Sequence, residues 1–294
     1  MKRFFMLAAW MLSLPTLASI TVTDDAGHVL VLAKPAERVV SFAPHVTELV
    51  FAAGGGGRLV GTVSHSDYPP AARSVPLIGD SRQIDIERLI AVKPDLLVVW
   101  FHGSSARQME QLQQLGIPIF YSEPRKLDDV ADSVLRLGRL LGTDAVATPR
   151  AAQLRQTLAQ LTARYSGRAP VRVFYQVWSK PLYTLNGRHI VSDALRICGG
   201  QNVFGALALT APTVNIEVVL LENPEAIVTG ANRNQSETGL EMWRAYPAMQ
   251  AVRNNNLFAV DADLLNRAGP RLIEGATTLC EKLDEARSHR GAAR

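Results

Sequence analysis

The stretch FAAGGGGRLVG, residues 51–61, contains four consecutive glycines and is the first candidate for chemistry. A glycine-rich loop can cradle phosphate groups and would then indicate a nucleotide enzyme. A P-loop needs a Lys followed by Ser or Thr, whereas these glycines lead into Arg58, Leu59 and Val60. A dinucleotide fingerprint lies between a strand and a following helix, and here the order is reversed. The glycines are therefore predicted to end a helix and let the chain turn into a strand.

A second group of residues suggests metal chemistry. His45 and Glu48 of the segment HVTE share one face of an expected helix, and HSD places His65 close to Asp67. Zinc sites need three or four ligands, and the chain has neither a Gly-x-Ser-x-Gly elbow nor a His-Glu-x-x-His motif. We therefore predict no catalytic residue and no metal site. An exported metal-dependent hydrolase using His45, His65 and Asp67 is the alternative, which metal analysis and a hydrolase screen would test.

The N-terminus predicts export. Lys2 and Arg3 precede an apolar stretch that starts at Phe4, and small residues follow around Ala18. This pattern is typical of a cleavable signal peptide, here predicted over 1–18, and its apolar core is shorter than the ~20 residues of a membrane helix. A buried N-terminal helix is the alternative. The leader has no Cys at the cleavage site, which argues against a lipid anchor, so we expect a free periplasmic protein.

Composition indicates a globular protein, with 47% hydrophobic and 20% charged residues. Removing the leader leaves 29 of the 31 basic residues against 27 acidic ones, a net charge of +2. That balance argues against a nucleic-acid-binding protein, which needs a concentrated basic face. Cys198 and Cys280 are the only cysteines, and in an oxidising compartment they favour one disulfide, with two buried free thiols as the alternative. The loop would be 82 residues long (280 − 198), stabilising by at most ~4–5 kcal/mol.

Strand-like and helical segments alternate through most of the chain. The strand-like ones are RVVSFA (38–43), RLVGTV (58–63), DLLVVW (95–100), IPIFYS (117–122) and VRVFYQVW (171–178), and the first helical ones are 46–53, 85–92 and 105–116. Such alternation predicts an α/β fold with mostly parallel strands.

The alternation stops in the middle of the chain. Apolar residues recur every three or four positions from Leu127 and again from Leu154, with a break at Gly142, which predicts two successive helices. Two α/β lobes joined by helix follow from this pattern. The predicted parts are a lobe at 19–126, a helical bridge at 127–166 and a second lobe at 167–294.

An internal repeat supports the two lobes. The segment IDIERLIAVKPDLLVV (84–99) aligns without gaps onto VNIEVVLLENPEAIVT (214–229), at a constant offset of 130 (217 − 87). Each copy has a polar N-cap, a short helix and a Pro before a buried strand, so Glu87 and Glu217 take equivalent places. A carboxylate in the first helical turn also suits the helix dipole, which would make both residues only structural.

A two-lobed chain without an evident catalyst is expected to bind a small molecule between the lobes. Candidate residues follow the predicted strands, although each aromatic one could equally belong to the core. They are Pro44 and His45, the segment 66–70, residues 100–102, Trp178 and the segment 261–271.

Five motifs in collinear order carry a resemblance to a known family. They are APHVTELVFAAG, SDYPP, IERLIAVKPDLLVVW, CGGQNVF and RAGPRLIEGATTLC, which together span about residues 36–285. The chain resembles the periplasmic cobalamin-binding proteins of vitamin-importing ABC transporters, and more broadly the class that binds cobalamin, haem and iron–siderophores. The resemblance implies two Rossmann-like lobes bridged by one long helix, with little hinge motion. It also implies a monomer that is not an enzyme, has no cofactor and delivers its ligand to transmembrane permease subunits.

The family's site residues carry over by position. Tyr68, Trp100 and Trp178 would pack on the flat corrin and its base, and Asp263 and Arg267 would hydrogen-bond its amide fringe. The implied ligand-binding set is Pro44, His45, Tyr68, Trp100, Trp178, Asp263 and Arg267. The paired carboxylates Glu87 and Glu217 match the residues that dock on permease arginines, and Cys198 and Cys280 match the family's disulfide.

The chain departs from the family pattern at several positions. Ser81 and Ala211 stand where the best-known cobalamin binder has tryptophans, which removes stacking area. The alignment around Trp178 needs an inserted residue. His45 is a further departure and a candidate to approach the metal of a corrin or haem. Cobalamin is the leading expectation for the ligand, a haem or siderophore is the nearer alternative, and a purely structural envelope protein would bind none of them.

Overall fold

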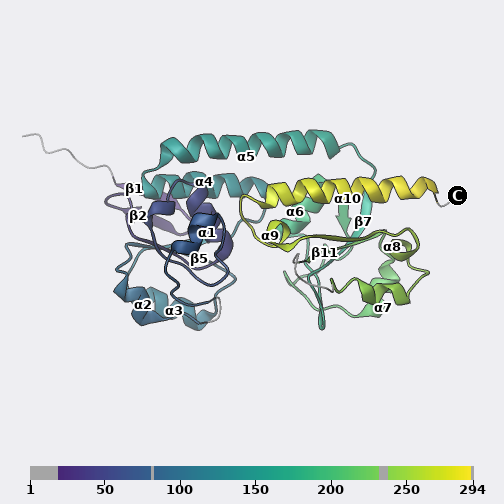
Figure 1. Cartoon of the computed structure of the whole chain (residues 1–294), viewed down its shortest axis with the longest axis horizontal. Coiled ribbons are helices and arrows are strands. Elements are labelled where there is room, and N and C mark those ends of the chain that lie inside the picture. Colours follow the sequence, from purple (N-terminus) through teal and green to yellow (C-terminus); the bar gives the residue numbers. More distant parts are fainter. Residues whose placement is uncertain (1–18, 81–82, 232–237, 293–294) are drawn as a thin grey trace, which may run out of the picture.

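The computed structural model describes residues 19–80, 83–231 and 238–292, so the predicted signal peptide and Ser81 lie outside the described residues. Figure 1 shows two lobes side by side, each with its own sheet, below a layer of long helices that lies over both. No described helix is long and apolar enough to span a membrane.

The first lobe is built on a parallel sheet with the strand order β4-β3-β5-β6. Its elements are β3 (Val39–Ser41), α1 (Pro44–Ala52), η1 (Gly56–Arg58), β4 (Leu59–Gly61), η2 (Pro70–Ser74), α2 (Ile86–Ala91), β5 (Leu96–Trp100), α3 (Ala106–Gln114) and β6 (Ile119–Ser122). The central strand β5 is buried on both faces: Leu96 and Val98 pack with α1 and α4, and Leu97 and Val99 pack with α2 and α3. A continuous apolar run is what a strand covered by helices on both sides requires.

The second lobe repeats this topology with the strand order β10-β7-β11-β12, again all parallel. Its elements are β7 (Val171–Gln176), β8 (Trp178–Ser179), β9 (Leu182–Tyr183), α6 (Ile190–Ile197), β10 (Gly200–Asn202), α7 (Ile216–Glu222), β11 (Ala226–Ala231), η3 (Glu241–Ala245), α8 (Gln250–Arg253), β12 (Leu257–Asp261), α9 (Ala262–Leu265) and α10 (Leu272–Ala292). In both sheets the strand that comes first in the chain lies between the second and the third, and the fourth lies at the edge beside the third. The predicted α/β fold with two Rossmann-like lobes and mostly parallel sheets is confirmed.

The layer above the sheets consists of α4 (Leu127–Leu141), α5 (Asp144–Tyr165) and α10. The helix α4 ends at Gly142, which has a left-handed backbone (φ 60°), and α5 then runs back over both lobes (Figure 1). A Cβ on Gly138 would lie 2.2 Å from the Cβ of Ala147, so the two helices approach closely there. The long connecting helix is therefore α5, and its 22 residues correspond to about 33 Å of helix.

The glycine run behaves as a helix end. The helix α1 stops at Ala52, and Gly54 takes a left-handed backbone (φ 83°) that L-residues rarely adopt. The chain then passes through η1 into β4, a helix-to-strand turn as predicted.

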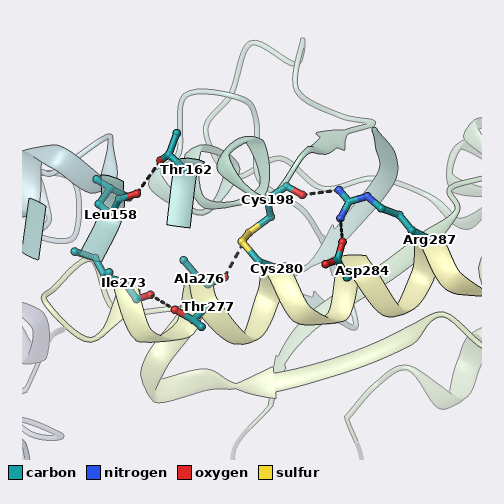
Figure 2. Close-up of a disulfide and its surroundings, with 9 residues drawn as sticks. All are labelled: Leu158, Thr162, Cys198, Ile273, Ala276, Thr277, Cys280, Asp284 and Arg287. Atoms are coloured by element: carbon teal, nitrogen blue, oxygen red, sulfur yellow. Dashed lines mark hydrogen bonds and ion pairs between the residues drawn. A yellow bond between two sulfur atoms is a disulfide. The ribbon is translucent and has the colours of Figure 1, made fainter. Parts of the chain in front are cut away.

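A disulfide joins α6 to α10 in the second lobe (Figure 2). Cys198 caps the C-terminus of α6, Cys280 lies within α10, and both are fully buried. Arg287 of α10 donates from Nη2 to the Cys198 carbonyl oxygen at 2.6 Å, so the same helix pair is also tied by a hydrogen bond. The predicted pairing is confirmed.

Candidate functional site

The strand order places the candidate site at a topological switch point. In such open sheets ligands bind beyond the carboxyl ends of two central strands whose connections leave in opposite directions. In the first lobe these strands are β3 and β5, which lead directly into Pro44–His45 and end at Trp100, respectively. The rings of His45 and Trp100 meet edge to face with centroids 5.3 Å apart.

His45 is buried although it lies at the expected site. Its residue surface is 5% exposed, and Nε2 has no hydrogen-bond partner among the described residues. Burial, and after it the positive charge of Arg267, lowers the pKa of His45 to about 4. His45 is therefore a neutral imidazole near pH 7.

The loop after β4 brings Tyr68 into the same region. Its backbone precedes Pro69 through a cis peptide bond, and its ring is exposed. The guanidinium of Arg271, from the second lobe, lies 4.0 Å from the ring centroid, a cation–π contact between the lobes.

Arg267 lies at the centre of the charged part of the site. Its Nη1 donates to Asp67 Oδ1 at 3.0 Å and to Glu48 Oε1 at 3.3 Å, and its Nη2 pairs with Asp263 Oδ1 at 2.8 Å. Burial opposes ionisation of Asp67, but the hydrogen bond and positive charge of Arg267 outweigh it and lower the pKa of Asp67. Two of the three carboxylates, on Glu48 and Asp67, belong to the first lobe.

Arg271 makes a second contact between the lobes, with Glu48 of α1. Its Nε donates to Glu48 Oε2 at 3.0 Å and its Nη2 to Oε1 at 2.6 Å, a two-point pairing. Burial disfavours the charged guanidinium of Arg271, but the hydrogen bonds and charge of Glu48 outweigh this and raise its pKa. We call Glu48, Asp67, Asp263, Arg267 and Arg271 the interlobe ion cluster.

Local structure in the second lobe fixes where the arginines lie. Asp261 at the end of β12 accepts a hydrogen bond from the Asp263 backbone amide at 2.9 Å and begins α9. Tyr175 of β7 donates its hydroxyl to Asn266 Oδ1 at 2.6 Å, directly before Arg267. Gly269 packs against α1, since a Cβ there would lie 3.5 Å from both His45 and Glu48.

The structure thus links six of the seven predicted ligand-binding residues through contacts with one another or with the interlobe ion cluster, and Trp178 is not among the six. Trp178 follows β7 on the β8–β9 hairpin, is 58% exposed and donates from Nε1 to the Lys180 carbonyl oxygen. Among the described residues, Trp178 forms no hydrogen bond or ring contact with the other six. Ala211, at a position of a family tryptophan, is also exposed, and Ser81 lies outside the described residues.

Sequence reasoning assigned no ligand-binding role to Glu48, and it included Asp67 and Arg271 only as members of the candidate segments 66–70 and 261–271. Glu48 was considered only as a metal ligand, and the described residues contain no group of three His, Cys, Asp or Glu that could hold a metal. The sequence contained one indication of this pairing. The helix α1 is apolar and buried but carries the carboxylate of Glu48 at its centre, and a buried carboxylate needs partners.

Glu87 and Glu217 take equivalent places in the two lobes. Each lies in the first turn of a helix that is capped by a side chain: Asp85 accepts from the Arg88 amide, and Asn215 accepts from the Val218 amide. Both glutamates are exposed and neither forms an ion pair with a described residue. The helices α2 and α7 lie on the side of the molecule away from α5 (Figure 1).

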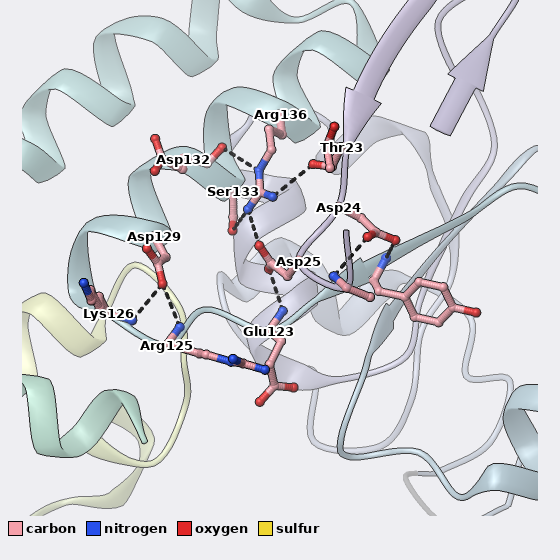
Figure 3. A network of polar contacts seen from close by, with 12 residues as sticks. Thr23, Asp24, Asp25, Glu123, Arg125, Lys126, Asp129, Asp132, Ser133 and Arg136 are labelled. Atoms are coloured by element: carbon pink, nitrogen blue, oxygen red, sulfur yellow. Dashed lines mark hydrogen bonds and ion pairs between the residues drawn. The ribbon is translucent and has the colours of Figure 1, made fainter. Parts of the chain in front are cut away.

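A groove of about 730 Å³ lies in the first lobe away from these residues, beside α4 and the hairpin β1 (Ile20–Thr23) and β2 (Val29–Leu32). Figure 3 shows that its charged side chains are held by hydrogen bonds to neighbouring backbone groups and by one ion pair. Asp25 pairs with Arg136 at 2.5 Å and accepts from the Glu123 amide at 2.6 Å. Asp129 accepts from the Arg125 and Lys126 amides, each at 2.9 Å. This network fastens the hairpin to α4, and none of the predicted ligand-binding residues lines the groove.

Comparison with known proteins gives one consistent result. A family model described as periplasmic binding protein matches residues 39–264. The chain is 37% identical over 250 residues to the vitamin B12-binding protein of Vibrio cholerae, covering 85% of this chain and 90% of that one. The crystal structure of the periplasmic vitamin B12-binding protein of Vibrio cholerae superposes with a TM-score of 0.80 at 37% identity, covering 86% of this chain and 98% of that one. A periplasmic heme-binding protein from Roseiflexus shares the fold at 23% identity, with a TM-score of 0.72 and coverage of 85% and 99%.

Proposed function

The chain belongs to the periplasmic binding protein family, and on this premise we propose that it captures cobalamin, vitamin B12, between its lobes and delivers it to an ABC importer in the inner membrane. The observation that carries the proposal is the convergence of Tyr68, Trp100, Asp263 and Arg267 from both lobes around one point beyond β3 and β5. The 37% identity to a vitamin B12-binding protein over most of both chains supports this choice of ligand.

The chemistry of these side chains suits a corrinoid. Cobalamin presents a flat ring with apolar faces and a rim of amides. Tyr68 and Trp100 are 41% and 37% exposed and can lie against such a face. The carboxylates of Asp67 and Asp263 can accept hydrogen bonds from amide N–H groups, and Arg267 can donate to amide carbonyls. We propose binding without catalysis, with His45 packed behind Trp100.

The role we propose for Glu87 and Glu217 is docking on the permease. Each glutamate has an exposed apolar neighbour on its own helix, Ile90 at 52% and Leu221 at 84% exposure. These residues lie one turn after the glutamates, on the same helical face. In each lobe one carboxylate without an ion-pair partner among the described residues lies beside one apolar side chain. This arrangement fits a partner with two equivalent basic sites, as two permease subunits provide.

Export through a cleaved signal peptide completes the proposal, because a binding protein for this importer must act in the periplasm. Mass spectrometry of the protein secreted to the periplasm should give a mature N-terminus near residue 19.

Calorimetric titration of the mature protein with cyanocobalamin, and in parallel with haemin, tests the ligand. We expect saturable one-to-one binding of cyanocobalamin with a Kd below about 1 μM, or about −8 kcal/mol. Tight binding of haemin without cyanocobalamin binding would change the ligand and keep the binding role. Failure of both to bind would refute the proposal.

Docking is tested separately with the double variant Glu87→Ala/Glu217→Ala. Its cyanocobalamin affinity should equal that of the parent, whereas cobalamin uptake through the cognate importer should fall to background. Full uptake by the double variant would contradict the docking role. Because the double variant keeps the capping residues Asp85 and Asn215, loss of the helix caps is not the cause of a loss of uptake.

A further inference from the structure

The interlobe ion cluster contains more negative than positive charge. Two guanidinium groups, on Arg267 and Arg271, face three carboxylates, so the five side chains carry a net charge of −1 (+2 − 3). Both guanidinium groups of the cluster are already paired with carboxylates. An anionic ligand would therefore have to displace these carboxylates before it could use the arginines.

Glu48 differs from the other two carboxylates in its burial. Its side chain is 2% exposed, against 47% for Asp67 and 45% for Asp263. It is also the carboxylate that contacts both arginines. A ligand can reach Asp67 and Asp263 and exchange hydrogen bonds with them, whereas Glu48 stays behind the arginines as a fixed counter-charge.

The burial of Glu48 makes its charge effective. Charges that are removed from water are screened less by solvent and salt than exposed charges are. Because Glu48 belongs to α1 and both arginines belong to the second lobe, its hydrogen bonds also hold the guanidinium groups in place against the first lobe.

We propose that Glu48 is the residue that sets the charge preference of the site. By neutralising Arg267 and Arg271 from behind, it makes the site accept a ligand with an uncharged amide rim and disfavour the same ligand when its rim carries carboxylates. This inference rests on the proposed binding of cobalamin. Glu48 acts through the arginines and is a positioning residue that does not itself touch the ligand.

The experiment compares two probes of nearly the same shape, cyanocobalamin and a cyanocobalamin monocarboxylate in which one peripheral amide is hydrolysed. The measured quantity is the ratio of their dissociation constants, from quenching of tryptophan fluorescence, for a series of variants. Glu48→Gln changes the cluster charge from −1 to 0, Arg271→Gln changes it to −2, and the double variant restores −1. Each unit of cluster charge should shift the ratio by about tenfold, the effect of a charge about 12 Å away at an effective dielectric constant of about 20.

The expected order is decisive. The preference for the uncharged probe should be strongest in Arg271→Gln, equal in the parent and the double variant, and weakest in Glu48→Gln. A purely structural role for Glu48 would weaken both probes alike and leave the ratio unchanged, which would overturn the inference. If the parent binds neither probe, it is the proposed function that fails, and the inference falls with it.

A matched control removes a similar charge elsewhere. Glu225 is buried and pairs with Arg290 within the second lobe, so Glu225→Gln should leave the ratio unchanged. If Glu48→Gln does not fold, the comparison of Arg271→Gln with the parent decides alone: a ratio that fails to move toward the uncharged probe would overturn the inference.

Discussion

Trp100 provides the most direct test of the proposed binding face. It ends β5 with 37% of its surface exposed and its ring edge to face with His45. A tryptophan side chain has about 250 Å² to bury, so a corrin that covers Trp100 would remove about 90 Å² from water. At about 25 cal/mol per Å² this contact is worth about 2 kcal/mol, or about 30-fold in Kd. Trp100→Ala should therefore weaken cyanocobalamin binding about 30-fold.

The neighbouring residue supplies the control. Phe101 is also 37% exposed, but its ring contacts His102 and Tyr121, with centroids 4.8 and 5.4 Å away. Phe101→Ala removes a similar exposed ring that does not contact His45. Calorimetric titration of both variants, after urea unfolding has shown that each is folded, gives the comparison. A Trp100→Ala variant within threefold of the parent, or an equal loss in Phe101→Ala, would refute the reasoning.

The disulfide, two buried histidines and the contact between α4 and α5 lead to further predictions. Replacing Cys198 and Cys280 by Ala should lower the free energy of unfolding by about 4 kcal/mol, since the disulfide closes an 82-residue loop, and urea denaturation should show this with ligand affinity unchanged. His45 and His189 both have pKa values lowered to about 4 by burial, so the unfolded chain binds more protons between about pH 6.5 and 4. Stability should fall as the pH is lowered through that window, by up to about 3 kcal/mol for each histidine, and His45→Asn should remove only its own share of the fall. Gly138→Ala should lower the thermal midpoint, because its Cβ would lie 2.2 Å from a Cβ of α5, and an unchanged midpoint would show that the helices can separate at little cost.

Much of the fold follows from the sequence because its signals are local. The buried strand β5 is an uninterrupted apolar run, and the repeat at 84–99 and 214–229 corresponds to α2–β5 and α7–β11, at the same place in the two sheets. The first hairpin, β1–β2, was not predicted. Its strands are short, and Val29 and Val31 face solvent, so the apolar residues of this segment do not indicate which side is buried. The hairpin is instead held by contacts with α4, which lies far away in the sequence.

The site was predicted only in part, because its polar contacts join distant segments. Arg271 and Glu48 are 223 residues apart, and no local pattern indicates that one will pair with the other. Arg267 was expected to be available for a ligand, yet its side chain is 14% exposed and is held by three carboxylates. The positions of such charges depend on how the two lobes pack against each other, which the periodicity of either lobe does not contain.

The burial of Glu48 and its two arginines indicates whether these charges serve stability or ligand binding. Removing an ion pair from water costs nearly as much as the pairing returns, so apolar residues at the same places would stabilise the contact between the lobes at least as well. The lobes are in any case connected by α5 and share one apolar core along α4, α5 and α10. Stability alone therefore does not account for Glu48 facing two arginines at this point. The proposed recognition of an amide rim would account for it, because such a rim requires both donors and acceptors in fixed positions. A donor such as Arg267 can be buried without excess positive charge only when a carboxylate such as Glu48 is buried with it.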